Sequence, residues 1–119
     1  MSSIDRPLSA DVLRFDLRDE RARVDDPELL ARHGRNARTL VKEGALRVTL
    51  VMLRAGGAIA PHRAPGAITL HVLDGDVHVQ AAGQEHRLSS GHLLVMNGGV
   101  EHTIDSKAGG VFLLTLVQP

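Results

Sequence analysis

The sequence predicts an all-β fold, a sandwich or barrel of short antiparallel strands with a short helix near its N-terminus. From about Thr39 onward, short apolar runs follow one another, and Gly-containing turns such as Gly56-Gly57 and Gly109-Gly110 separate them. Strands that recur at this spacing between turns are typical of all-β sandwiches and barrels. The first part of the chain is instead rich in charge. We therefore expect an N-terminal arm with the short helix in residues 1–36 and a single barrel domain in residues 37–119.

The composition limits the function classes. The chain has 119 residues, 14 Lys and Arg against 14 Asp and Glu, and no Cys. This length suits one domain, and the lack of Cys excludes disulfides and thiolate metal sites. Balanced charge argues against a nucleic-acid or anionic-membrane partner. The N-terminus has no apolar signal segment, and no apolar run approaches the length of a membrane span, so we expect a cytoplasmic protein.

The predicted helix occupies the segment from Asp25 to Gly34. Asp25 is a suitable N-cap with Glu28 three residues later, as in a capping box, and Pro27 falls in the first turn, where its missing N–H costs nothing. Gly34 can end the helix in the left-handed conformation. Residues 11–26 have mixed charges and weak periodicity, so we expect a solvated arm with a short edge strand there.

A β-hairpin is predicted at Asp74-Gly75, because this dipeptide tolerates the positive φ angles of a type I′ turn. Counting outward from the turn puts His71 opposite His78 on a polar face. These two are interpreted most simply as surface or subunit-interface histidines, since two ligands alone seldom hold a metal. The opposite face is entirely apolar and contains Ile68, Leu70, Val72, Val77, Val79 and Ala81.

The run Leu46–Leu53 is apolar on both faces, so its alternation does not show which side chains point into the barrel. Such a run is typical of a strand buried on both sides, as in a sandwich core with a subunit interface.

Two segments together resemble the signature motifs of the cupin superfamily. The first runs from Gly57 and His62 to Val72-Leu73-Asp74-Gly75, the second contains Gly91, Gly99 and His102, and the match covers about residues 57–106. The resemblance implies a small RmlC-like protein, an antiparallel jelly-roll barrel closed into a cup, usually as a homodimer. Many members hold one divalent metal inside the cup on three His and one Glu.

The metal-binding motifs are incomplete in this chain. His62 and His102 match two of the histidines, whereas the second His of the first motif falls on Ala64 and its Glu falls on Ile68. Catalytic metal sites generally use three protein ligands and a water. We therefore expect no tightly bound cofactor, and a divalent metal held only weakly by His62 and His102.

Three functions remain open. The first is binding of a small, mainly apolar ligand in an aliphatic cup with a degenerate metal site. The second is a metal-dependent enzyme of oxygenase or isomerase type that uses His62, His102 and a non-standard third ligand, from Asn97, Gln84 or another side chain that the sequence does not place. The third is a dimeric structural or regulatory module without a ligand. The pocket expected for the first function contains His62, Ile68, Leu70, Val72, Met96 and His102. The sequence assigns no catalytic residue.

Overall fold

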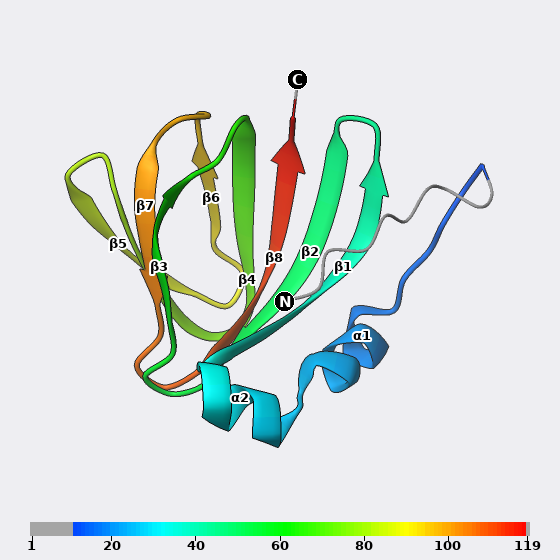
Figure 1. Cartoon of the computed structure of the whole chain (residues 1–119), viewed down its shortest axis with the longest axis horizontal. Coiled ribbons are helices and arrows are strands. Elements are labelled where there is room, and N and C mark those ends of the chain that lie inside the picture. Colours follow the sequence, from blue (N-terminus) through cyan, green and yellow to red (C-terminus); the bar gives the residue numbers. More distant parts are fainter. Residues whose placement is uncertain (1–10, 119) are drawn as a thin grey trace.

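The all-β prediction is confirmed. A computed structural model describes residues 11–118, in which a curled antiparallel sheet forms a half-barrel with two short helices outside it (Figure 1). The helices are α1 (Leu17–Val24) and α2 (Pro27–His33). The strands are β1 (Arg35–Glu43), β2 (Leu46–Leu53), β3 (Ala58–Arg63), β4 (Ala67–Ala81), β5 (Gln84–Ser89), β6 (Leu93–Met96), β7 (Glu101–Asp105) and β8 (Gly110–Val117).

Strand β4 joins the two walls of the half-barrel. Its first half pairs with β8 on one side and β6 on the other, and β8 continues to β2 and β1. Its second half pairs with β5 and β7, and β7 continues to β3. The strands thereby form a jelly-roll arrangement that curls around an interior between the two walls (Figure 1).

The predicted hairpin at Asp74-Gly75 is wrong, because β4 runs through this dipeptide as a single strand. The register between β4 and β8 shifts between Val72 and Asp74, which marks a β-bulge, and Gly75 has a φ of 77°. The left-handed glycine therefore bends the strand from one wall to the other instead of reversing the chain. A tight reversal lies further on at Ala82-Gly83, where both φ angles are positive, as a type I′ turn requires.

The predicted apolar face of β4 is nevertheless confirmed. Ile68, Leu70 and Val72 before the bulge, and Val77 and Val79 after it, are all buried in one core cluster. The extra residue of a bulge shifts the alternation of side chains by one position, as a two-residue reversal would also do. Even-numbered residues before the bulge and odd-numbered residues after it therefore share one apolar face.

The proposed cross-strand pair of histidines is lost with the hairpin. His71 pairs with Leu93 and Leu113 in one wall, and His78 pairs with Arg87 and Asp105 in the other. Nδ1 of His78 lies 3.6 Å from Oε1 of Glu85 on β5.

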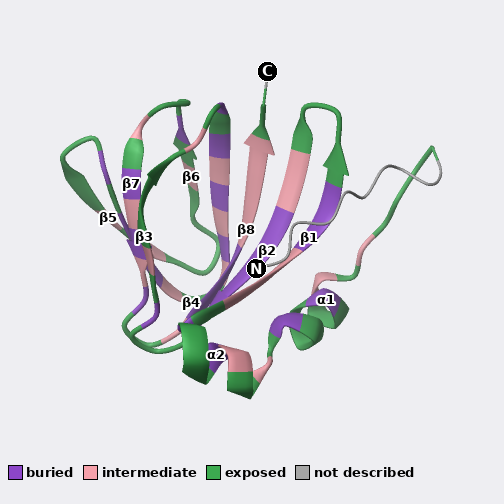
Figure 2. Ribbon diagram, in the orientation of Figure 1, coloured by how far each residue is buried: buried purple, intermediate pink, exposed green. Residues whose placement is uncertain are grey.

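Two hydrophobic clusters lie on opposite sides of β2, which explains its doubly apolar sequence. Val51 and Leu53 point into the barrel core, whereas Leu50 and Met52 belong to a second cluster with Val24 of α1. The buried stripes on β1, β2 and β4 are visible in Figure 2. Helix α1 of the same chain thus packs on the outer face of β2, and no subunit interface is needed to explain this face. The homodimer stays a prediction.

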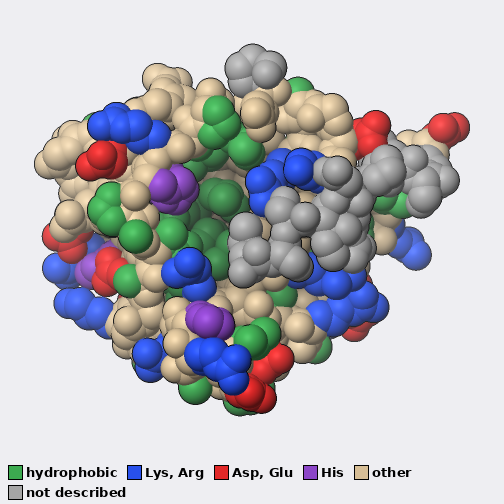
Figure 3. All heavy atoms as spheres, in the orientation of Figure 1, with side chains coloured by type: hydrophobic (Ala, Val, Ile, Leu, Met, Phe, Trp, Pro, Cys, Tyr) green, Lys and Arg blue, Asp and Glu red, His purple; other side chains and the backbone are tan. Residues whose placement is uncertain are grey.

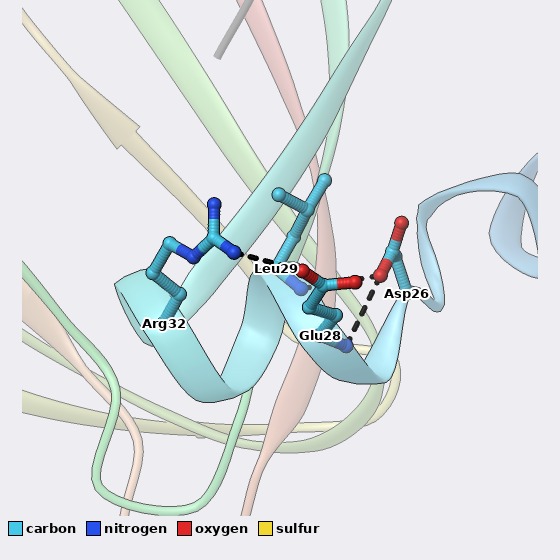
Figure 4. Close-up of polar contacts among 4 residues, drawn as sticks. All are labelled: Asp26, Glu28, Leu29 and Arg32. Atoms are coloured by element: carbon cyan, nitrogen blue, oxygen red, sulfur yellow. Dashed lines mark hydrogen bonds and ion pairs between the residues drawn. The ribbon is translucent and has the colours of Figure 1, made fainter.

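The predicted helix is confirmed as α2, with its cap shifted by one residue. Asp26, not Asp25, is the N-cap, and its carboxylate accepts hydrogen bonds from the backbone N–H of Glu28 and Leu29, each at 3.1 Å (Figure 4). Arg32 donates a hydrogen bond to Glu28 one turn earlier, at 2.7 Å. Gly34 ends the helix with a φ of 78°, as expected.

Helix α1 corrects the expectation of a solvated arm over residues 11–26. Asp16 caps it, and the buried carboxylate of Glu20 accepts a 2.7 Å hydrogen bond from Nε of Arg38 on β1. A second contact holds this helix to the sheet: Arg21 forms an ion pair of 2.7 Å with Asp74, which follows the bulge of β4. This hydrogen bond, together with one from the Gly75 N–H, lowers the pKa of Asp74. Partners distant in the sequence thus hold the helix against the sheet.

No helix within residues 11–118 is long and apolar enough to cross a membrane.

Candidate functional site

A cavity of about 480 Å³ lies between the two walls of the half-barrel. Figure 3 shows hydrophobic side chains in the hollow on this face, with basic side chains beside it. The apolar part of its wall contains Ala37, Val51, Ile59, Ile104, Phe112 and Leu114, from five strands. An apolar concavity with a few polar groups is the usual form of a small-ligand site.

His62 and His102 meet at one side of this cavity. They are directly paired across β3 and β7, and their ring centroids lie 4.3 Å apart in an edge-to-face arrangement. His62 is exposed, and its Nδ1 lies 3.4 Å from the Ala60 carbonyl oxygen. His102 is only 2% exposed. The structure therefore brings these two histidines together at the cavity, and their part in binding stays a prediction.

The hydrogen bond of His102 determines which ring nitrogen is free. Its Nδ1 lies 3.0 Å from the Val100 carbonyl oxygen. Because a carbonyl oxygen can only accept, Nδ1 of the neutral ring carries the proton and Nε2 keeps a lone pair. Nε2 is buried and has no hydrogen-bond partner among the described residues. A buried acceptor without a partner is unfavourable, so this atom is a natural contact for a ligand.

The side chains around the histidine pair do not fit the metal of the cupin motifs. Ala64 and Ile68, which stand where the motifs carry a His and a Glu, are both in the cavity wall and offer no donor atom. Across residues 11–118, no three His, Asp or Glu side chains are grouped so that they could hold a metal ion. Two imidazoles alone are fewer than the three protein ligands of an ordinary catalytic site.

The structure separates the six predicted pocket residues into two groups. His62, Ile68 and His102 line the cavity. Leu70, Val72 and Met96 are buried in the same core cluster but are not in the cavity wall that the described residues form.

Three arginines in the wall of the cavity were missed by the sequence analysis. Arg63 donates to the Gly99 carbonyl oxygen at 2.8 Å and pairs with Glu101 at 3.3 Å. Arg35 donates to the Ala58 carbonyl oxygen at 3.3 Å. On β2, the cavity is lined by every second residue, namely Arg47, Thr49 and Val51, which share one face of the strand. This alternation would have revealed Arg47 if the inward side of β2 had been known. Since no Asp or Glu is among the described lining residues, the wall carries positive charge.

Solved structures with the same fold come from several bacteria. A conserved protein of unknown function from Streptococcus pyogenes is 25% identical, with a TM-score of 0.69 over 100% of this chain and 96% of its own. An RmlC-like cupin from Shewanella frigidimarina is 20% identical, with a TM-score of 0.69 over 73% of this chain and 78% of its own. A salicylate 1,2-dioxygenase mutant from Pseudoaminobacter salicylatoxidans, in complex with gentisate, is 18% identical, with a TM-score of 0.77 over 87% of this chain and 32% of its own.

Comparison with curated proteins returned no match. The family model described as a cupin domain matches residues 49–116, which is more than half of the chain. This match agrees with the jelly-roll strand order and with the RmlC-like structures, and the chain belongs to the cupin superfamily.

Proposed function

We propose that this cupin binds a small, mainly apolar molecule that donates a hydrogen bond to His102. The observation that carries the proposal is the buried Nε2 of His102, which has no partner among the described residues and belongs to a ring in the wall of an apolar cavity. A ligand hydroxyl at this atom would satisfy the acceptor, and the aliphatic wall would cover the rest of the molecule. The salicylate dioxygenase mutant, which contains the same fold, is in complex with a small molecule, gentisate, and this supports the proposal.

Phenol and toluene form a matched pair of probes, because they have similar size and only phenol has a hydroxyl donor. Phenol is expected to bind more tightly than toluene, by about fivefold, which corresponds to roughly 1 kcal/mol for one hydrogen bond. In His102→Phe, which keeps a ring and removes Nε2, this preference should disappear. Titration calorimetry gives both affinities, and the melting temperature should rise with ligand concentration.

His86 provides the control variant, because it lies on β5 and is not in the cavity wall. His86→Phe should keep the preference for phenol. If neither probe binds at millimolar concentration, the proposed function fails, and a structural or regulatory module without a ligand is favoured instead.

We also propose that the metal site is degenerate. Protein purified without a chelator should contain well under one equivalent of divalent metal per chain by elemental analysis, because His62 and His102 alone bind too weakly to retain it. Retention of one metal per chain, with its loss in both His62→Ala and His102→Ala, would contradict this and favour a metal-dependent enzyme.

A further inference from the structure

Arg47 is an unneutralised cation in the wall of an otherwise apolar cavity. Its side chain is partly buried, and no hydrogen bond or ion pair joins it to another described residue. A partly desolvated guanidinium is costly without an anion, and the described cavity wall offers no carboxylate to it.

The strand register places Arg47 in the same inner row as Ile68. Arg47 pairs with Leu116 of β8, and Leu116 pairs with Ile68 of β4. Directly paired residues of antiparallel strands share a face, and all three line the cavity. With strands about 4.8 Å apart, Arg47 begins roughly 10 Å from Ile68. Ile68 occupies the position at which the cupin motif carries its metal-binding Glu. This inner row of side chains therefore lacks the Glu carboxylate and contains the guanidinium of Arg47.

The other two arginines are less suited to meet a ligand. Arg63 already has Glu101 as a partner. Arg35 donates to a backbone carbonyl and pairs with Leu53, at the end of β2 opposite to Arg47. Among the three arginines of the cavity wall, Arg47 is therefore the one whose N–H donors form no hydrogen bond or ion pair with a described residue.

We propose that Arg47 binds the carboxylate of the cavity ligand, which makes the ligand class a small apolar carboxylic acid. This inference rests on the proposed function and narrows it. The planar guanidinium offers two parallel N–H donors that match a carboxylate, while the aliphatic wall covers the apolar body of the acid and His102 accepts from its hydroxyl. The proposed binding is non-covalent.

The test compares the three hydroxybenzoate isomers with the corresponding hydroxybenzamides, which have nearly the same shape without the negative charge. By titration calorimetry, at least one hydroxybenzoate should bind about tenfold more tightly than its amide, as expected for a charge-assisted contact. In Arg47→Gln the two affinities should become equal. Arg47→Lys should recover part of the preference, because it keeps the charge and loses the paired donors.

Arg87→Gln is the matched control, since Arg87 lies on β5, is exposed and is not in the cavity wall. This variant should keep the tenfold preference, and added salt should weaken the acids more than the amides. Equal affinity of acid and amide for the unaltered protein, or a preference that survives in Arg47→Gln, would overturn this inference and leave the proposed function intact. Failure of the acids, the amides and phenol to bind would overturn both.

Discussion

Replacing Gly75 by Ala is expected to lower the free energy of unfolding by roughly 3 kcal/mol. Gly75 has a φ of 77°, which an L-residue adopts only with strain. A Cβ at this position would also overlap the carbonyl oxygen of Gly109 and come within 2.8 Å of the Gly110 Cα. Because both obstacles are backbone atoms, they cannot move aside without shifting the start of β8. Since the chain has no Trp or Tyr, urea unfolding is best followed by far-ultraviolet circular dichroism.

Gly83→Ala separates strain from overlap. Gly83 has a similar φ of 74°, but a Cβ there would meet nothing within 4 Å. The loss should therefore be about 1 kcal/mol, the cost of the left-handed conformation alone. Equal losses in the two variants would contradict the view that β4 passes closely against β8 at the bulge.

The bulge between Val72 and Asp74 explains why the sequence pattern predicted the right faces with the wrong connection. Both a two-residue reversal and a bulge bring Val72 and Val77 to the same face, so the alternation of apolar residues cannot distinguish them. The choice between a reversal and a bulge depends on the pairing of β4 with β8. Strand β8 begins at Gly110, 35 residues after Gly75. A pattern limited to neighbouring residues contains no information about that partner.

The two helices illustrate the same limit. The caps of α2 are local, and the sequence pattern predicts that helix with an error of one residue at its start. Helix α1 has Glu20 buried by its contact with Arg38 of β1, and only the folded chain brings these residues together. Seen alone, a charged segment with weak periodicity gives no reason to predict a packed helix.

The candidate site was predicted in part for a related reason. His62 and His102 were identified through the spacing of the cupin motifs, and they do meet in the cavity. Arg47 lies on β2, whose inward side could not be fixed because the run Leu46–Leu53 is apolar on both faces. Once α1 is seen to pack on the side of Leu50 and Met52, the alternate residues, including Arg47, must face the interior. The charge of the cavity thus became visible only with the tertiary structure.

Phe112→Ala is expected to cost about 3–5 kcal/mol, the largest loss predicted for this chain. Phe112 is completely buried, it is paired with Val51 and Val72 on its two sides, and its ring also forms part of the cavity wall. Truncation removes core contacts and joins the new space to the existing cavity. Urea unfolding should show the loss directly.

Phe112→Leu and a ligand test whether the lost stability comes from this shared wall. Leucine keeps most of the apolar volume, so its cost should be roughly 1–1.5 kcal/mol. Toluene, which binds the enlarged cavity of the native state only, should recover more stability in Phe112→Ala than in the unaltered protein. A loss below about 1 kcal/mol in Phe112→Ala would mean that the ring does not support the core. Because Phe112 serves both the core and the cavity, the cavity cannot be enlarged at this position without weakening the barrel, whereas Arg47 can be exchanged with little effect on the core.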